Sequence, residues 1–493
     1  MMSFWFHEGV TIYLVQTVFA WLLIILVCGA AYPWAAWLLA KNPRDDGRSL
    51  TVIVGFALSV GMLTLLMLWE ALLGVHLQWW SITLPFALLM LVGWLLWLGS
   101  RDAQGRCPPT PKSLSHRMAL LIVAIVSAAT LFNAAYWPFS RTDAQRIYAR
   151  YGRVMWIEGT LVSFVTRDDS FYQAYPVLVP MTITYTYLAS GWKNEYLARI
   201  IPTLLSLGCL PAAYVLGKML YGEQAGVVSL ALLALTPAFG RWASAGYVDL
   251  PMAFFYTLAA IFAWRLRASQ HWTDALLAGV MMGLAAWTKN AALPGIPLLA
   301  VWLVWLWVKR EINIRLLALS LAACAGIAAP WYVRTLAEAG MIIPPTAWTD
   351  QAQPNLDNLL IFITHPEIFG LTGWAIAVGL IATTVQALRR AQPAFLLLWT
   401  LPYFGFWWLL LSYDSRFLLM FLPPLVVLGG AWCVKLWERI PALWQKRLLP
   451  LGVALGLLLA LHAAWLSVEF KDALLRHPLM SHEEKLALIE EGS

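Results

Sequence analysis

The sequence predicts an all-α fold, a polytopic bundle of transmembrane helices. Of its 493 residues, 61% are hydrophobic and only 12% are charged, whereas soluble domains have roughly 45–50% apolar and 25% charged residues. The apolar residues form runs of about 20, the length that crosses a hydrocarbon core. The 29 Trp and 17 Tyr are typical of helix ends at membrane interfaces. The composition excludes a water-soluble protein, and we interpret the net charge of +7 as a signal for membrane orientation rather than for nucleic-acid binding.

The apolar runs predict about fourteen spans, separated by short charged or Pro- and Gly-containing turns. No Lys or Arg precedes the first run, so we expect it to remain as a span rather than to be cleaved as a signal peptide. In chain order the predicted spans cover residues 11–31, 50–74, 80–99, 118–138, 200–219, 224–246, 250–266, 274–288, 291–308, 315–332, 368–388, 394–411, 417–436 and 448–467.

The segment 176–190 is short for a span and contains two Pro and three Thr residues, so we expect it to lie in the interface without crossing. With that choice, the later short loops place twelve Lys and Arg residues on one side of the membrane and four on the other. The basic loops 41–49 and 100–117 give the same orientation. Because basic residues mark the cytoplasmic side, the N-terminus, the loop 139–199 and the C-terminal tail are predicted to be extracytoplasmic.

Three parts are expected along the chain. Residues 1–117 form an N-terminal extension of three spans, 118–436 a central module with the extracytoplasmic loop 139–199, and 437–493 the last span and a tail. Within the loop, residues 143–158 have helical spacing, with Ile147, Val154 and Ile157 on an apolar edge. This spacing is typical of a helix that lies on the membrane surface.

Several ionisable residues converge on the predicted outer surface. Asp249 lies in a tight turn between two apolar runs, where it either caps the next helix or serves a site. Lys289 and Arg416 flank apolar runs, where they either extend to the interface or bind a ligand. Asp143 begins the helical part of the loop. Two cations and at least two carboxylates at one surface favour a functional site, to which the same loop could add Glu158, Asp168 and Asp169.

The segments that hold these residues resemble, in their order, the GT-C superfamily of polytopic glycosyltransferases, whose relatives include protein O-mannosyltransferases and the aminoarabinose transferase of lipid A. The resemblance runs from about residue 118 to 436. TDAQRIYARYGRVMWIEG is similar to the family's first extracytoplasmic loop, and YPVLVPMTITYTYLASG to its Pro-Leu juxtamembrane segment. GYVDLPMAFF resembles the second carboxylate site. The Thr-Lys-Gly, Pro-Trp-Tyr and Arg-Tyr-Leu-Leu-Pro segments have counterparts in GLAAWTKNAALPGIPLL, APWYVRTLAEAG and SRFLLMFLPPLVVLGGA.

The resemblance implies transfer of a sugar from a polyprenyl-phosphate donor to an acceptor hydroxyl of a glycan, lipid or protein, by a single inverting displacement. The reaction is expected on the extracytoplasmic side of a bacterial inner membrane. Asp143 would be the general base, and Asp249 would position hydroxyls or orient Asp143. Lys289 and Arg416 would hold the donor phosphate. Further candidate substrate contacts are Tyr148, Glu158, Asp168, Asp169, Tyr172 and Tyr175.

Two other functions remain open: a transporter or flippase of lipid-linked sugars, which would also bind a lipid phosphate, and a ligase that transfers a whole glycan chain. The sequence shows no convincing internal repeat of the kind common in transporters. No cofactor is expected with certainty. The family's frequent Asp-Glu pair is Asp143-Ala144 here, so a divalent metal would need another acid, from Glu158, Asp168 or Asp169.

Overall fold

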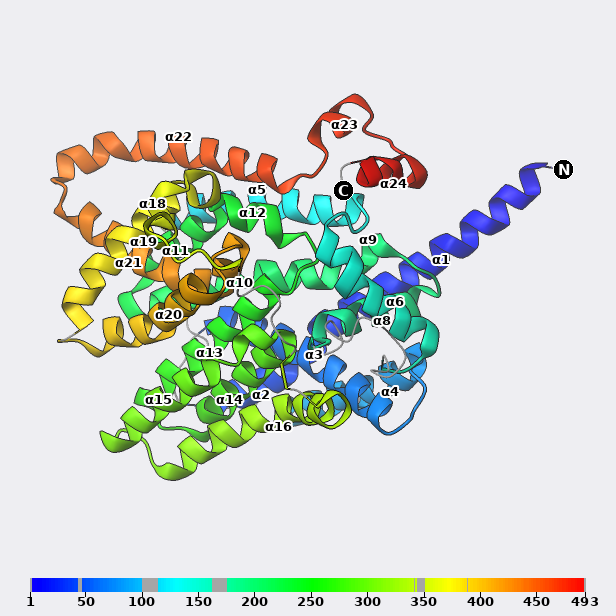
Figure 1. The fold of residues 1–493 in the computed structure, drawn as a ribbon, viewed down its shortest axis with the longest axis horizontal. Helices are drawn as coiled ribbons and strands as arrows, with labels where there is room; N and C mark the ends of the chain where they lie inside the picture. Colours follow the sequence, from blue (N-terminus) through cyan, green and yellow to red (C-terminus); the bar gives the residue numbers. More distant parts are fainter. Residues whose placement is uncertain are drawn as a thin grey trace.

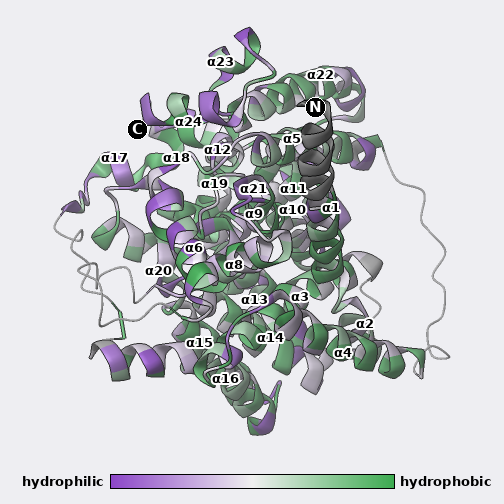
Figure 2. Cartoon of the chain, turned by 90° about the vertical axis from the view of Figure 1, so that its right-hand side faces the viewer, coloured by the Kyte–Doolittle hydropathy of each residue, from purple (hydrophilic) through white to green (hydrophobic). Residues whose placement is uncertain are grey.

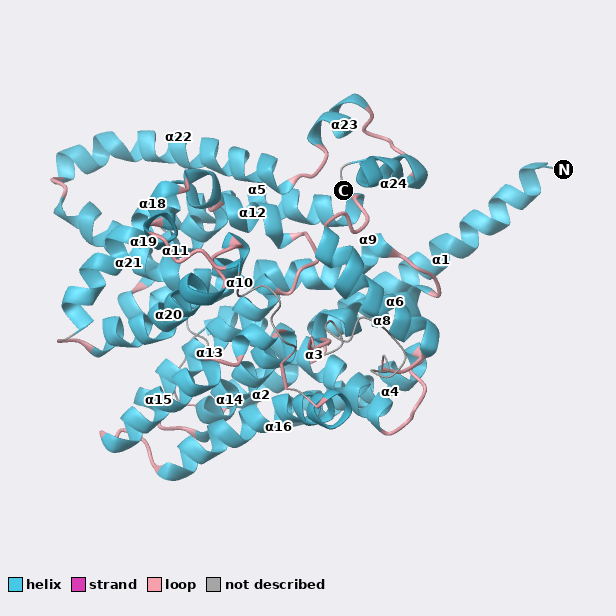
Figure 3. Cartoon of the chain, in the orientation of Figure 1, coloured by secondary structure: helices cyan, strands magenta, loops and turns pink. Residues whose placement is uncertain are grey.

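The structure is a computed structural model, and it describes residues 2–42, 47–99, 114–161, 175–340, 342–343, 351–387 and 389–491. These residues form helices joined by turns and loops, with no strand among them (Figure 3). The helices pack into one bundle, from which the first turns of α1 (Met2–Gly29) project (Figure 1). The predicted all-α fold is confirmed.

The N-terminal helices follow the predicted spans closely. They are α1, α3 (Gly47–Leu72), α4 (Trp79–Leu98) and α5 (Leu114–Tyr136). A short helix outside the predicted spans, α2 (Tyr32–Ala40), has a Pro in its first turn and packs against α3 and α4. α3 also contacts helices of the central module, so the N-terminal helices belong to the same bundle.

The predicted loop helix is present, with an irregular start. Residues 142–158 are continuously helical, and they comprise the π-helical turn η2 (Ala144–Ala149) and the α-helix α6 (Arg150–Glu158), which ends at the left-handed Gly159. The three residues predicted to form one apolar edge differ in burial: Ile147 and Val154 are buried, whereas Ile157 is 67% exposed. An exposed apolar side chain is what a helix on a membrane surface presents to the lipid.

The segment predicted to stay in the interface forms α8 (Leu178–Ser190), which packs against α1, α3 and α6. Its 13 residues make a helix of about 20 Å, shorter than the roughly 30 Å of a bilayer core. It is therefore absent from the helices that are long enough to span a membrane.

Among the remaining helices, α13 (Asp249–Ser269) lies in the core, and its side chains are almost all buried. α13 packs against α10, α14 and the 3-10 helix η5. Asp249, the first residue of α13, therefore lies near the end of α14 and the start of η5. The other elements are α9 (Glu195–Ala198), α10 (Ile200–Tyr221), α11 (Glu223–Ala234), α12 (Pro237–Ala243), α14 (Trp272–Thr288), η3 (Asn290–Ala292), α15 (Gly295–Val308), α16 (Ile314–Ala339), α17 (Leu356–Leu359), α18 (Ile361–Thr364), α19 (Pro366–Ala387), α20 (Ala391–Leu410), η5 (Ser415–Phe421), α21 (Leu422–Arg439), α22 (Ala442–Ser467), α23 (Lys471–Arg476) and α24 (His482–Glu491).

The chain is an integral membrane protein. Among the described residues, 11 helices are long and apolar enough to cross a membrane, or up to 12 if the bent pair α11 and α12 forms one span. Most helices are hydrophobic along their length, whereas hydrophilic residues gather in short elements such as α17 and α23 (Figure 2). The count of fourteen is not confirmed. α11 and α12 meet at 65°, α14 has only 17 residues, and α13 carries three charged residues.

Candidate active site

Five charged residues from distant parts of the chain meet around one guanidinium group. Nη1 of Arg416 lies 2.9 Å from Oδ2 of Asp143, and its Nε lies 3.7 Å from Oδ2 of Asp249. Nζ of Lys289 lies 2.5 Å from the other oxygen of Asp249. Asp414, which the sequence analysis did not single out, is 3.4 Å from Nη2 of Arg416. We call these five residues the charged cluster.

Each member of the charged cluster stands where a helix begins or ends. Asp143 lies at the start of the loop helix, and Asp249 is the first residue of α13. Lys289 has an extended backbone between α14 and η3. Asp414 caps η5 because its Oδ1 accepts the backbone N–H of Arg416 at 2.8 Å. A polar side chain at a helix end does not interrupt the apolar part of the helix, and several helix ends at the same depth bring such side chains together.

The turn before Asp249 depends on a glycine. Gly246 has a φ of +78°, in the left-handed region, and a Cβ at this position would meet the ring of Phe139 at 2.5 Å. Only a residue without a side chain fits both the backbone conformation and the contact. The tight turn thereby brings the start of α13 against the chain that leads to Asp143.

The charged cluster has a buried part and a more exposed part. The side chains of Asp249, Lys289 and Arg416 are 2%, 8% and 11% exposed, whereas those of Asp143 and Asp414 are each 34% exposed. Lys289 therefore does not extend to the interface, and the carboxylate of Asp249 pairs with it instead of capping α13. Buried charges need close partners, and these two supply them to each other.

Aromatic rings enclose the two cations. The guanidinium of Arg416 lies 4.4 Å from the ring centre of Tyr247 and 5.6 Å from that of Trp242, and Nζ of Lys289 lies 4.4 Å from that of Phe417. Such contacts attract cations to ring faces. Burial raises the pKa of Tyr247 to about 12, so its hydroxyl stays neutral at physiological pH. This hydroxyl accepts the backbone N–H of Asp143 at 3.4 Å.

Two buried polar atoms of the charged cluster lack a hydrogen bond. Oδ2 of Asp249 and Nε of Arg416 have no hydrogen-bond partner among the described residues, and the 3.7 Å between them is too long for such a bond. Buried polar atoms in folded proteins are almost always hydrogen-bonded. An unpaired acceptor and an unpaired donor side by side therefore mark a place where a ligand can complete the bonding.

Of the other predicted contact residues, the structure brings Tyr148 to the charged cluster. Tyr148 lies in η2, is buried, and its ring centre is 6.1 Å from that of Tyr247. Burial raises the pKa of Tyr148, the charge of Asp249 raises it further, and Tyr175 is close enough to interact with it.

Glu158 is not brought to the charged cluster. It is exposed at the far end of the loop helix, about 22 Å along the helix axis from Asp143 at 1.5 Å per residue. Asp168, Asp169 and Tyr172 lie outside the described residues.

A buried arginine ties together the segments that carry the two predicted catalytic aspartates. Arg199, at the start of α10, is fully buried and donates to the backbone carbonyls of Trp137 at 2.8 Å, Pro138 at 2.6 Å and Ser244 at 2.6 Å. The first two carbonyls precede the loop helix, and the third precedes the tight turn before α13. The only sequence signal for Arg199 is a single cation at the start of an apolar run.

Glu469, which follows α22, pairs with Arg199, and we call these two residues the buried anchor. Its carboxylate accepts hydrogen bonds from Ser140 at 2.7 Å and Arg141 at 3.1 Å, and lies 3.4 Å from Arg199. Burial alone would raise the pKa of Glu469, but the charges of Arg199 and Arg141 outweigh burial and hold the pKa below its ordinary value. These contacts hold the C-terminal segment against the start of the loop that carries Asp143.

A polar pocket adjoins the charged cluster along the chain. It has a volume of about 660 Å³ and includes Ser412 and Tyr413, which directly precede Asp414. A backbone N–H of the opposite wall donates to Oγ of Ser412 at 2.8 Å. Amide, carboxyl and imidazole side chains that can hydrogen-bond to hydroxyl groups line the rest, among them Gln353, Asn355, Asn358, Asp357 and His365.

The described residues contain no group of three or more His, Cys, Asp or Glu side chains arranged to hold a metal ion. The three aspartates of the charged cluster surround Arg416 instead.

Comparisons with known proteins agree with this architecture. A family model described as dolichyl-phosphate-mannose-protein mannosyltransferase matches residues 175–333, which include Asp249 and Lys289 but less than half of the chain. A search of curated proteins finds no match.

Among solved structures, the chain is similar to ArnT from Cupriavidus metallidurans bound to undecaprenyl phosphate. The TM-score is 0.52 and the identity 17%, over 72% of this chain and 70% of that one. It is similar to the same protein in the apo state with a TM-score of 0.50 and 19% identity, over 69% of this chain and 64% of that one. At this identity the likeness establishes a shared fold, and it agrees with the resemblance predicted from the sequence.

Proposed function

We propose that this membrane protein, which has the fold of the GT-C superfamily, is a glycosyltransferase that moves a sugar from a polyprenyl-phosphate donor to an acceptor hydroxyl. The observation that carries the proposal is the convergence of Asp143, Asp249, Lys289 and Arg416 from distant segments into one charged cluster. The shared fold with a protein bound to undecaprenyl phosphate supports a lipid phosphate as part of the donor. The loop charges support the extracytoplasmic side of the membrane as the place of reaction, and we propose a bacterial inner membrane as its location.

Arg416 and Lys289 would bind the donor phosphate. A guanidinium presents several N–H groups in one plane and matches phosphate oxygens, and an ammonium adds a compact charge. The phosphate would take the place of Asp143 and Asp414 at Arg416, because these two carboxylates are partly exposed whereas Asp249 is buried. Both cations then face the negative charge that grows on the leaving phosphate, which needs no general acid.

Transfer would be a single displacement. The acceptor oxygen attacks the anomeric carbon, and the bond from that carbon to the phosphate oxygen breaks with its electron pair left on the phosphate. Asp143 takes the proton of the acceptor hydroxyl once the phosphate has replaced it at Arg416. Because attack and departure occur on opposite faces, the anomeric configuration inverts. Asp249, held by Lys289, would fix sugar or acceptor hydroxyls with its unpaired oxygen.

The polar pocket beside Asp414 would receive the hydrophilic part of the acceptor. Its amide and imidazole side chains offer both donors and acceptors, which suits a substrate rich in hydroxyl groups. Each aspartate of the charged cluster lies close to a cationic side chain, and the displacement proposed here is written with these side chains alone.

The test is a transfer assay with the purified protein in vesicles, with a panel of undecaprenyl-phosphate sugars as donors and release of undecaprenyl phosphate as the readout. Asp143→Asn should lower the rate by about 10² to 10⁴, the usual contribution of a general base. Asp414→Asn is the matched control, because Asp414 is equally exposed and also pairs with Arg416. We expect it to change the rate by less than about tenfold.

Equal rates for Asp143→Asn and the unchanged protein would remove Asp143 as the base. Sugar movement across the vesicle membrane without release of undecaprenyl phosphate would contradict transfer and would support a flippase.

A further inference from the structure

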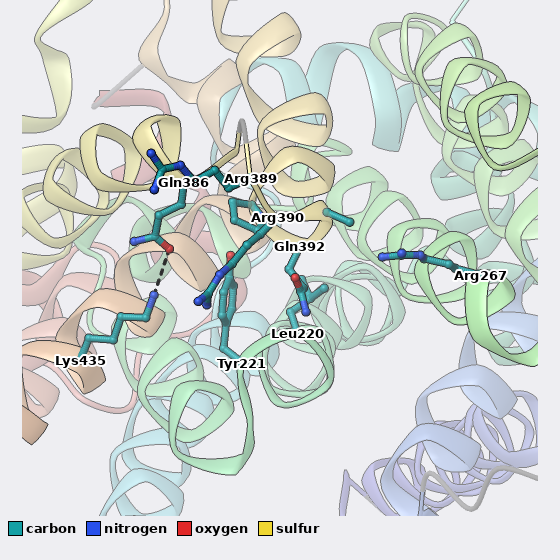
Figure 4. Close-up of a pocket in the computed structure, with 10 residues that line it drawn as sticks. Leu220, Tyr221, Arg267, Gln386, Arg389, Arg390, Gln392 and Lys435 are labelled. Atoms are coloured by element: carbon teal, nitrogen blue, oxygen red, sulfur yellow. Dashed lines mark hydrogen bonds between the residues drawn. The ribbon is translucent and has the colours of Figure 1, made fainter. Parts of the chain in front are cut away.

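A second, strongly basic pocket lies far from the charged cluster, and the proposed reaction does not use it. Its volume is about 520 Å³, and four cationic side chains line it together with Tyr221 and two glutamines (Figure 4). The four cations are Arg267, Arg389, Arg390 and Lys435. We call it the basic pocket.

The basic pocket and the charged cluster lie at opposite ends of shared helices. Arg416 stands at the start of the candidate span 415–439 and Lys435 near its end. In the same way, Asp249 begins α13 and Arg267 lies in its last turn, about 27 Å away at 1.5 Å per residue. The two sites therefore face opposite surfaces of the membrane.

Three of the four cations have no ion-pair partner within the part of the chain that the structure describes. Arg267 is neutralised by Glu311, with N–O distances of 2.6 and 3.2 Å. Arg389, Arg390 and Lys435, by contrast, form no ion pair with any described residue, and Nζ of Lys435 donates only to the amide oxygen of Gln386 at 3.2 Å (Figure 4).

The charges in the basic pocket repel one another. Arg390 lines the pocket together with Lys435, while Arg439 and Glu438, which carry opposite charges, both follow Lys435 by about one turn of α21. Like charges held close together and partly shielded from water raise the energy of the folded protein. An anion between Arg389, Arg390 and Lys435 would remove this cost.

The position of the basic pocket indicates where the anion comes from. The candidate span of α10 ends at Tyr221, that of α19 ends at residue 387, and that of α20 begins at residue 391. The pocket is thus at the level of the lipid headgroups. Nζ of Lys435 also lies 4.9 Å from the ring centre of Trp432 and 5.8 Å from that of Tyr221, and such aromatic rings are typical of the membrane interface.

We propose that the basic pocket binds the phosphate of an anionic membrane lipid in the leaflet opposite the charged cluster. The guanidinium groups of Arg389 and Arg390 would grip the phosphate oxygens and Lys435 would add its charge, while Gln386 and Gln392 could bond to headgroup hydroxyls. Basic pockets between membrane helices on the cytoplasmic side are suited to anionic headgroups. The loop charges predict that side for this pocket.

The experiment measures phosphatidylglycerol binding to the full-length purified protein by native mass spectrometry. Arg390→Gln/Lys435→Gln should weaken binding about 25-fold, since each basic residue near an anionic surface contributes roughly a fivefold factor. The matched control is Lys446→Gln/Arg447→Gln, which removes the same charge near the start of α22, outside the pocket. Phosphatidylglycerol should also raise the unfolding midpoint of the unchanged protein and of the control, but not of the pocket variant.

Three outcomes would overturn the proposal. The control variant could lose phosphatidylglycerol as strongly as the pocket variant, which would show that only net charge matters. Phosphatidylcholine could bind and stabilise as well as phosphatidylglycerol. Inorganic phosphate at millimolar concentration could stabilise the protein while phosphatidylglycerol does not, which would make the pocket a site for a soluble anion. None of these readouts depends on sugar transfer.

Discussion

Replacing Asp249 with Asn should destabilise the protein far more than its small change in shape suggests. The substitution removes one partner of a buried ion pair and leaves the ammonium of Lys289, only 8% exposed, without its carboxylate at 2.5 Å. Arg416 keeps Asp143 and Asp414, so the loss falls mainly on Lys289. Breaking a buried pair in this way costs about 3–5 kcal/mol.

The double variant Asp249→Asn/Lys289→Met separates this cost from a general disturbance of the turn. It removes both charges, and replacement of a buried pair by uncharged side chains is often neutral. We therefore expect the double variant to recover most of the stability lost by Asp249→Asn, although it should not transfer sugar.

The assay is unfolding by SDS in mixed micelles, followed by Trp fluorescence. Glu223→Gln is the control, because Glu223 pairs with Lys218 at a similar distance, 2.6 Å, but both side chains are about half exposed. An exposed pair contributes about 0–1 kcal/mol. Equal losses for Asp249→Asn and Glu223→Gln, or single-variant losses that simply add in the double variant, would refute the reasoning.

Three further predictions concern the phosphate contact, the buried anchor and the loop helix. Arg416→Gln should weaken binding of a polyprenyl phosphate by at least about tenfold, since charge-assisted hydrogen bonds contribute roughly 1.5–3 kcal/mol; unchanged binding in a vesicle pull-down would exclude Arg416 from the phosphate site. The pKa of Glu469 is held below its ordinary value of 4.5 by Arg199 and Arg141, so its stabilising effect is complete above about pH 4.5 and is lost as the pH falls through the lower folded pKa. Glu469→Gln should flatten this acid dependence, and an unaltered pH profile of unfolding would contradict the assignment. Gly152→Ala should cost about 1–3 kcal/mol, because a Cβ there would meet Ile183 at 2.6 Å; stability equal to that of the unchanged protein would show that α6 can shift freely.

Most of the helices were predictable because their signal is local. Runs of about 20 apolar residues specify membrane helices whatever their neighbours, since a backbone in lipid must satisfy its own hydrogen bonds. The same reasoning singled out Asp249, Lys289 and Arg416, because a charge beside an apolar run is costly unless it is paired or used. Asp143 was singled out by its place in the polar loop and by the family resemblance. Their chemical roles remain predictions.

Other features depend on contacts between distant segments. The π-helical turn in the loop helix, which packs on α8, interrupts the regular spacing that the sequence predicts, and the bend between α11 and α12 lowers the number of spans that the described helices support. Asp414 looks like an ordinary turn residue until Arg416 is seen beside it. Glu158 shares a loop with Asp143, but a rigid helix holds the two apart.

By itself the sequence determined that this protein is a bundle of membrane helices with charged residues at helix ends, because hydrophobic transfer and backbone hydrogen bonding act on each segment separately. Only the tertiary structure decided which charges neutralise each other. Asp249 became the partner of Lys289, and Arg199 became the anchor of two loops. By contrast, Arg389, Arg390 and Lys435 form no ion pair with an acid among the residues that the structure describes. These pairings depend on the rotation and relative height of packed helices, which no single stretch of sequence contains.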